Sequence, residues 1–180
     1  YDVIIFLAWE GLPNRSPELN KKNYENTLRF IDFCKIYFSG LLIFSGSGLE
    51  YGARKGELFE DMAPIDPDSF ATSKLAILNY LEKSGLSYIW LRFFYVYGVG
   101  QHANSLLWSS YTQLVQDKTP TLLKPFDKHD FIYCKDVALA IKNILVKTRE
   151  LGIFNIGAGI SISNLEFVSE IASILGKKEI

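Results

Sequence analysis

Cysteine, histidine and methionine are scarce in this chain of 180 residues, which contains two, two and one of them. The two cysteines, Cys34 and Cys134, are too few for a disulfide framework and are typical of a reducing compartment. With only His102 and His129, the sequence offers little for a Ser-His-Asp triad or a histidine-rich metal site. We therefore expect neither a disulfide scaffold nor a bound metal.

The chain has neither an excess of one charge nor a long apolar run. Lys and Arg number 19 against 20 Asp and Glu, a net charge of −1, so the basic excess typical of nucleic-acid binding is missing. No apolar run reaches the roughly 18 residues that a transmembrane helix needs. The sequence opens at Tyr1 directly on a strand pattern, with no initiator Met or cleavable signal. These features predict a cytoplasmic globular protein that binds neither nucleic acid nor membrane and whose sequence starts in mid-fold.

Short apolar runs alternate with amphipathic segments along most of the chain. Buried strands are expected at residues 3–8, 41–44, 86–94 and 153–156, with a shorter one near 131–133. Helices are expected at residues 23–37, 70–84, 106–116, 136–147 and, after a capping box, 164–175. This alternation predicts an α/β protein with a parallel sheet, and its fading after about residue 100 predicts a smaller final lobe.

Two glycine-rich segments come after expected strands, where a phosphate-binding turn or a nucleophile is often found. Gly157-Ala-Gly159 lacks the third glycine of a dinucleotide-binding turn, so a turn that needs positive φ explains it better. Ser45-Gly-Ser-Gly48 lacks the framing glycines of a hydrolase nucleophile elbow, and Ser47 has no evident histidine partner. Neither segment by itself predicts a site.

Five segments, taken in their order along the chain, point to a family. They are Ile4-Ile-Phe-Leu-Ala8, Phe44-Ser-Gly-Ser-Gly-Leu-Glu-Tyr-Gly52, Leu91-Arg-Phe-Phe-Tyr-Val-Tyr-Gly98, His129-Asp-Phe-Ile-Tyr-Cys-Lys-Asp-Val137 and Phe154-Asn-Ile-Gly157. In this order they resemble the extended short-chain dehydrogenase/reductase family, the NAD-dependent nucleotide-sugar epimerases, dehydratases and 4-ketoreductases. The resemblance implies a doubly wound parallel Rossmann-type sheet lacking its first strands. It assigns residues 1–100 to the C-terminal half of a Rossmann-type dinucleotide-binding domain, and 101–180 mainly to a substrate-binding lobe with a returning strand and helix.

The same resemblance implies a catalytic set of Ser47, the residue at position 70 and Lys74. In the family, a Tyr exchanges a proton with the sugar while hydride moves to or from the nicotinamide, and the Lys ammonium lowers the pKa of that Tyr. Ser47 would hydrogen-bond the reacting oxygen. The implied contacts with the cofactor, NAD or NADP, come from Leu7, Ala8, Ser45, Lys74, Phe93, Tyr95 and Val96. The implied contacts with a nucleotide-sugar substrate come from Ser47, Gly48, Tyr95 and His129.

The sequence departs from the family pattern in three places. Phe70 stands at the Tyr position and has no proton to exchange, a loss that typically costs about 10²–10⁴ in rate. A natural pseudoenzyme, a Tyr→Phe change or a Tyr omitted after Phe70 would each explain it, and the spacing from Pro67 favours the omission. The family's first strands, with their Gly-x-x-Gly-x-x-Gly turn, would lie upstream of Tyr1, so the sequence is either cut short or a half-domain completed by a partner. His129 replaces the Arg that usually grips the nucleotide phosphates.

The two residues after Ser47 narrow the choice of reaction. Gly48 and Leu49 stand where dehydratases typically place an Asp-Glu pair, so loss of water is not expected. Hydride transfer at C4 of the sugar remains, by a 4-ketoreductase or a 4-epimerase. The alternative is a catalytically degenerate member that acts as a sugar-nucleotide binding or partner module. The helices at 23–37 and 70–84 correspond to the family's dimerisation pair, which implies a homodimer, and Arg92 beside aromatic residues is expected to anchor structure.

Overall fold

The structure, a computed structural model, describes residues 2–148 and 150–177 of the chain and divides into two compact units. The first unit is Tyr1–Phe93 with Val146–Ile156, and the second is Phe94–Leu145 with Gly157–Ile180. The predicted assignment of residues 1–100 to cofactor binding and 101–180 mainly to substrate binding stays a prediction, because compactness does not say what each unit binds.

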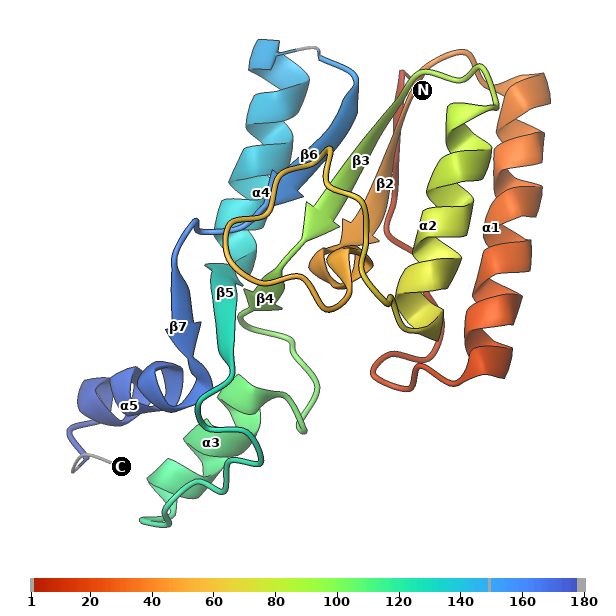
Figure 1. The fold of residues 1–180 in the computed structure, drawn as a ribbon. Helices are drawn as coiled ribbons and strands as arrows, with labels where there is room; N and C mark the ends of the chain where they lie inside the picture. Colours follow the sequence, from red (N-terminus) through yellow and green to blue (C-terminus); the bar gives the residue numbers. More distant parts are fainter. Residues whose placement is uncertain (1, 149, 178–180) are drawn as a thin grey trace. The chain divides into compact units, whose positions relative to one another are not determined.

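A four-stranded parallel sheet lies at the centre of the first unit, with strand order β1-β2-β3-β6 (Figure 1). The strands are β1 (Val3–Phe6), β2 (Leu41–Ser47), β3 (Tyr88–Phe93) and β6 (Gly152–Ile156). This sheet confirms the predicted α/β fold. The prediction of a strand over 3–8 was too long, because pairing with β2 ends at Phe6 and the chain then leaves the sheet. The strand predicted at 86–94 is likewise limited to β3.

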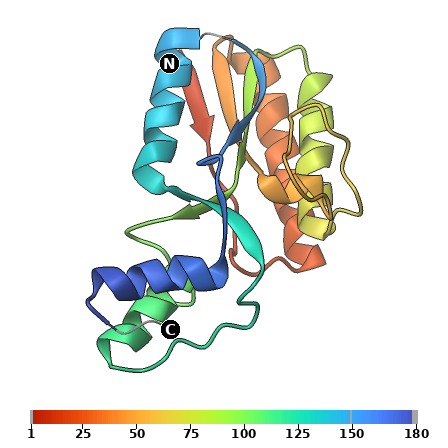
Figure 2. The same cartoon turned by 60° about the vertical axis from the view of Figure 1, so that its left-hand side comes forward.

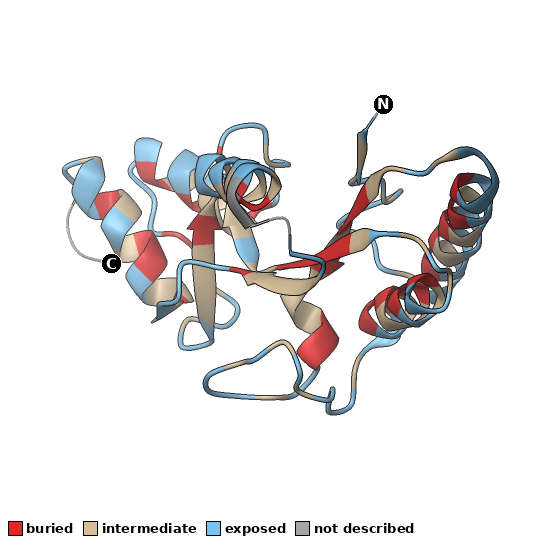
Figure 3. Cartoon of the chain, turned by 90° about the horizontal axis from the view of Figure 1, so that it is seen from above, coloured by how far each residue is buried: buried red, intermediate tan, exposed pale blue. Residues whose placement is uncertain are grey.

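Two helices, α1 (Pro17–Tyr37) and α2 (Ser69–Glu82), pack against each other and against this sheet (Figure 1). The buried stretches of β2 and β3 are red in Figure 3, and their apolar side chains meet those of the two helices. The buried core consists of Ile31, Cys34, Leu42, Phe44, Ile77, Leu78, Leu81 and Trp90. Burial of one large apolar side chain contributes about 1.5–3 kcal/mol, so this cluster is a main source of the unit's stability.

Capping side chains set where α1 and α2 begin. Ser16 Oγ accepts the Leu19 N–H at 3.3 Å, and Pro17 occupies the first turn, so α1 starts earlier than the predicted residue 23. The carboxylate of Asp68 accepts the Ala71 N–H at 2.8 Å and starts α2. Because of this cap, the residues of the first turn of α2 have fixed positions at the carboxyl end of the sheet's strands.

The second unit contains a three-stranded sheet of β4 (Tyr95–Tyr97), β5 (Lys128–Tyr133) and β7 (Ser161–Ser163). The central strand β5 pairs parallel with β4 and antiparallel with β7. Of these three strands, the sequence predicted only the last part of β5, near residues 131–133. The strands β4 and β7 were missed, because three residues are too few to show an alternating pattern. This small mixed sheet differs from the parallel sheet of the first unit.

The helices of the second unit are α3 (Leu106–Val115), α4 (Cys134–Asn143) and α5 (Asn164–Ile174), with α5 beside α3 (Figure 2). The predicted helix at 136–147 begins earlier, at Cys134, and its last part is a π-helical turn, Ile144–Thr148. The capping box predicted for α5 is confirmed, since Ser163 Oγ accepts the Glu166 N–H at 3.1 Å and Glu166 accepts the Ser163 N–H at 2.6 Å. Within the described ranges, no helix combines the length and apolarity needed to cross a membrane.

Candidate active site

Ser47 ends β2, at the edge of the parallel sheet where strand carboxyl ends form ligand sites in open α/β folds. A short 3-10 helix, η1 (Gly48–Tyr51), begins directly after it. The Ser47 N–H donates to Glu50 Oε1 at 2.7 Å, and Ser47 Oγ accepts the Leu49 N–H at 3.2 Å. Ser47 is therefore held by both its backbone and its side chain.

Lys74 projects from α2 onto the end of the same strand. It is buried, with 5% of its surface exposed, and its ammonium donates to the Ser45 carbonyl oxygen at 2.8 Å. The ammonium also lies 4.0 Å from the centroid of the Trp9 ring, a cation–π contact. Burial lowers the pKa of Lys74 to about 8, although the negative charge of Glu50 acts in the opposite direction. Lys74 is thus a buried ammonium whose charge responds to a modest change in its surroundings.

Phe70 lies one helical turn before Lys74, on the same buried face of α2, as the spacing predicts. Its ring meets the Trp9 ring edge-on at 5.1 Å between centroids, and the Lys74 ammonium is 5.8 Å from its centroid. A phenyl ring has no dissociable proton. Phe70 therefore contributes an apolar wall beside the ammonium and cannot act as an acid or base.

Trp9 is a site residue that the sequence reasoning did not assign. It lies after β1, and its ring contacts both Lys74 and Phe70. The indole N–H is buried and finds no acceptor among the residues that the structure describes. The one signal in the sequence that could have found it is a large aromatic residue directly after the expected strand at 3–8.

The other predicted residues of the first unit lie at strand ends. Leu7 and Ala8 come after β1 and are exposed, Gly48 opens η1, and Phe93 ends β3. The remaining predicted residues, Tyr95, Val96 and His129, belong to the second unit. The roles assigned to all of these residues stay predictions.

In the second unit, Tyr95 and His129 stack with their ring centroids 3.8 Å apart. The ring of Phe131 meets His129 at a steep angle, 5.9 Å away. Burial lowers the pKa of His129 below its usual value, which favours the neutral form of its imidazole. A neutral stacked imidazole cannot supply the permanent charge with which an Arg grips phosphate.

The turn at Gly157–Gly159 does not offer its amides to a ligand. The Asp130 carboxylate accepts the Ala158 N–H at 2.6 Å and the Gly159 N–H at 2.8 Å. A Cβ on Gly157 would meet Asp130 Oδ2 at 2.5 Å, and Gly159 has a φ of 76°. The prediction of a turn that needs glycine is therefore confirmed over that of a phosphate-binding turn.

The sequence matches a protein-family model over residues 1–157, that of the NAD dependent epimerase/dehydratase family. The chain belongs to this family. Membership agrees with the expected fold and with the resemblance of its five ordered segments. The family model covers the whole of the candidate site in the first unit.

Two curated relatives are similar over most of the chain. The uncharacterized UDP-glucose epimerase YtcB of Bacillus subtilis (strain 168) is 27% identical over 162 residues, covering 87% of this chain and 51% of that protein. The dTDP-4-dehydro-6-deoxyglucose reductase of Escherichia coli is 28% identical over 192 aligned positions, covering 99% of this chain and 60% of that protein. The chain thus spans about half to three fifths of the length of these relatives.

Solved structures share the fold closely. A UDP-N-acetylglucosamine 4-epimerase from Methanobrevibacter ruminantium M1, in complex with UDP-N-acetylmuramic acid, superposes with a TM-score of 0.86 at 25% identity. That similarity covers 99% of this chain and 62% of the epimerase. A UDP-glucuronic acid 4-epimerase from Bacillus cereus in complex with NAD has a TM-score of 0.86 at 24% identity, covering 98% of this chain and 61% of the epimerase. The second likeness establishes the fold alone.

The donors in the first unit fit the ribose of a nicotinamide cofactor, the cofactor class of this epimerase/dehydratase family. The Lys74 ammonium has three N–H donors, and the Ser45 carbonyl accepts one of them. The Trp9 indole N–H, for which no described residue is an acceptor, adds a donor beside the ammonium. Ribose hydroxyl oxygens accept such bonds, so Lys74 and Trp9 are suited to hold that part of the cofactor.

Proposed function

We propose that the protein transfers hydride between a nicotinamide cofactor and C4 of a nucleotide sugar, as a 4-ketoreductase or a 4-epimerase. The observation that carries this proposal is the buried Lys74 ammonium, 2.8 Å from the carbonyl oxygen of Ser45 and at the same strand end as Ser47. Membership of the epimerase/dehydratase family supports it, and the family's name favours NAD over NADP.

Each predicted site residue has a proposed role. Lys74 binds the nicotinamide ribose, and the Ser47 hydroxyl donates a hydrogen bond to the reacting sugar oxygen. The cofactor, when bound, supplies or accepts the hydride. Phe70 lines the site and exchanges no proton, so the unaltered protein is a slow catalyst, by about 10²–10⁴ relative to one with a Tyr there. Further cofactor contacts come from Leu7, Ala8, Ser45, Phe93, Tyr95 and Val96, and substrate contacts from Gly48, Tyr95 and His129.

The second candidate function, a catalytically degenerate binding or partner module, is favoured by one observation. Phe70 is 6% exposed and stacks edge-on with Trp9, so the position next to Lys74 is filled by an apolar ring. A module of this kind would bind the sugar nucleotide and leave it unchanged.

Replacement of the buried lysine tests the proposal. We expect Lys74→Met to lower the rate of reduced-nicotinamide oxidation with a UDP- or dTDP-4-keto-hexose by about 10²-fold or more, because the ribose contact and the ammonium are lost. Lys83→Met is the matched control, since Lys83 is exposed at the end of α2. Binding of the sugar nucleotide without any turnover, in the unaltered protein and in Phe70→Tyr alike, would favour the binding module instead.

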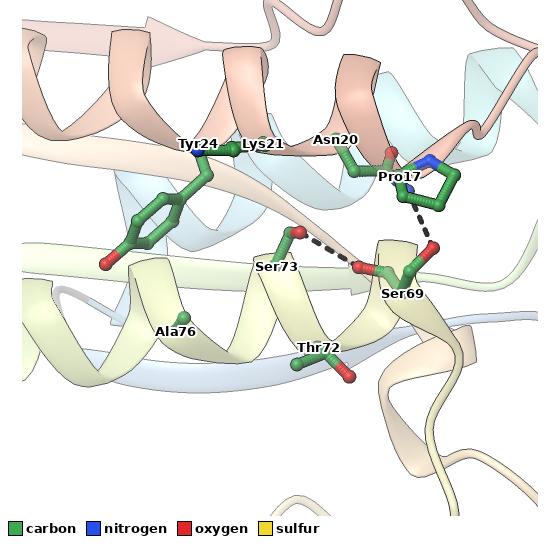
Figure 4. Close-up of a pocket in the computed structure, with 8 residues that line it drawn as sticks. All are labelled: Pro17, Asn20, Lys21, Tyr24, Ser69, Thr72, Ser73 and Ala76. Atoms are coloured by element: carbon green, nitrogen blue, oxygen red, sulfur yellow. Dashed lines mark hydrogen bonds between the residues drawn. The ribbon is translucent and has the colours of Figure 1, made fainter.

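A homodimer through α1 and α2 is part of the proposal. The C-terminal end of α1 exposes three large apolar side chains, with Phe33 57%, Ile36 71% and Tyr37 71% exposed. At the N-terminal ends of the two helices, a hollow of about 220 Å³ lies between them (Figure 4). Its lining is Pro17, Asn20, Lys21, Tyr24, Ser69, Thr72, Ser73 and Ala76. Analytical ultracentrifugation, which compares the sedimentation of the Ile36→Glu variant with that of the Lys21→Glu variant, tests whether the apolar end of α1 joins two copies.

The cytoplasmic location of the protein stays a prediction.

A further inference from the structure

Glu50 is a buried carboxylate directly behind Ser47. Only 1% of its surface is exposed, and burial raises the pKa of its carboxyl group while the Arg92 guanidinium acts in the opposite direction. Its Oε1 accepts the backbone N–H of Ser47 at 2.7 Å, and both oxygens lie 3.1 Å from the Trp90 indole nitrogen. Its Oε2 accepts Arg92 Nε at 2.8 Å. The carboxylate therefore joins the candidate catalytic serine to the neighbouring strand β3.

Arg92 is itself held in one position. It is 4% exposed, and its Nη1 donates to the Tyr51 hydroxyl at 3.0 Å and to the Glu60 carbonyl oxygen at 2.9 Å. The Tyr51 hydroxyl in turn donates to Asn155 Oδ1 at 2.7 Å. A buried ion pair adds little net stability on average, because desolvation offsets the attraction. Its clearest effect here is to hold the Glu50 carboxylate in one place.

Gly46 of β2 has no side chain, so that strand can run close to Trp90 and Glu50. A Cβ at this position would meet the Trp90 indole nitrogen and would lie 2.7 Å from Glu50 Oε1. On one side of Gly46 the Ser45 carbonyl accepts the Lys74 ammonium, and on the other the Ser47 N–H donates to Glu50. The end of β2 is thus held at Ser45 by the buried Lys74 ammonium and at Ser47 by the buried Glu50 carboxylate.

We propose that Glu50 is a positioning residue of this site. Its carboxylate fixes the backbone of Ser47, and Arg92 and Trp90 in turn hold that carboxylate in place. The inference rests on the proposed function for the role of the Ser47 hydroxyl. Because Ser47 Oγ accepts the Leu49 N–H, the single hydroxyl proton is directed away from that amide and toward a substrate oxygen. Glu50 acts on Ser47 through this placement and touches no reacting atom in that role.

The same carboxylate acts on Lys74, which is also in contact with Ser45, Trp9 and Phe70. The negative charge of Glu50 opposes the fall in the Lys74 pKa that burial causes. Removing that charge while keeping the shape of the side chain will therefore lower the pKa of Lys74 further. This consequence can be measured without any substrate.

The first experiment monitors Lys74 by NMR in protein labelled at lysine, with its signal assigned by Lys74→Met. We expect a titration midpoint near pH 8 in the unaltered protein, a lower midpoint in Glu50→Gln, and an unchanged midpoint in the exposed control Glu57→Gln. Thermal unfolding shows whether Glu50→Gln remains folded. An unchanged Lys74 midpoint in folded Glu50→Gln would overturn the coupling of the two groups, whether or not the protein turns over a sugar nucleotide.

A double-mutant cycle on turnover tests the positioning of Ser47. Glu50→Gln should lower kcat by up to about 10²-fold with little change in KM, since a displaced group loses rate more than binding. In a Ser47→Ala background the same substitution should have a smaller effect, because the positioning of the Ser47 hydroxyl no longer matters. Equal losses in both backgrounds would overturn the positioning of Ser47 by Glu50. If no variant turns over, the proposed function fails, and the NMR titration still decides whether Glu50 acts on Lys74.

Discussion

Two basic side chains, Lys74 in the first unit and His129 in the second, lie against aromatic rings in different ways. Burial lowers the pKa of both. Lys74 has a fixed acceptor in the Ser45 carbonyl and feels the negative charge of Glu50. His129 is stacked on Tyr95, and the charges that act on it, from Asp127 and Lys124, oppose each other. The first unit is therefore built to keep a cation, whereas the second offers a neutral ring suited to stacking.

Breaking the ion pair of the first unit should have the largest effect on stability. Arg92→Met leaves Glu50 as a buried carboxylate without its partner, and we expect a loss of about 3–5 kcal/mol in the free energy of unfolding. Arg15→Met removes the exposed pair with Asp68 and should cost about 0–1 kcal/mol. Urea unfolding monitored by circular dichroism measures both, and equal losses would contradict the importance of burial.

The pH dependence of stability should separate the two basic groups. The folded pKa of Lys74, about 8, lies below its ordinary value of 10.5, so the unfolded chain binds more protons between these values. The contribution of Lys74 to stability should therefore rise with pH across this window, by about 1.4 kcal/mol per pH unit for one proton. Lys74→Met should remove this rise and Lys83→Met should keep it. A rise of the same slope in Lys74→Met would show that another group titrates there.

In the second unit, the carboxylate that holds the turn at Gly157–Gly159 should have a smaller effect. Asp130→Asn keeps one acceptor oxygen and replaces the other with a donor that faces an amide, so we expect a loss of about 1–3 kcal/mol. Asp127→Asn is the matched control, because Asp127 is exposed. An equal free energy of unfolding in both variants would mean that the turn holds its shape without Asp130.

The smallest effect is expected at His129. Its folded pKa lies below 6.5, so stability falls as pH drops through the range between 6.5 and the folded pKa. His129→Phe should keep the stack on Tyr95 and abolish this acid sensitivity. His102→Phe should leave it in place. Unfolding curves at neutral and mildly acidic pH compare the two variants, and the same acid sensitivity in both would contradict the assignment to His129.

Much of this fold was predictable, because the spacing of apolar residues along the sequence indicates where buried strands and helices lie. The parallel sheet, α2 and the capping box at Ser163 are encoded in short stretches of sequence. The family resemblance also paired Ser47 with Lys74, and the structure places both at the end of β2. By contrast, β4 and β7 span three residues each, too few for a pattern, and the early start of α1 depends on a Ser-Pro cap inside a segment that resembles a loop.

The side chains that complete the site were harder to find, because their partners are distant in the sequence. Glu50 meets Arg92 across 42 positions, and the Tyr51 hydroxyl meets Asn155 across 104. Neither pairing has a local signature. The contact of Trp9 with Lys74 likewise depends on the pairing of β1 with β2 and on the packing of α2 against β2, which no pattern in the sequence encodes.

Hydride transfer itself tests the proposed function most directly. The measurement is the incorporation of deuterium from C4-deuterated reduced nicotinamide cofactor into a UDP- or dTDP-4-keto-hexose, detected by mass spectrometry, in the unaltered protein and in Phe70→Tyr. We predict a sugar heavier by one deuterium in both, formed about 10²–10⁴ times faster with the tyrosine, whose proton the Lys74 ammonium makes available. A sugar nucleotide that binds to both proteins and gains no deuterium from either would contradict the proposal.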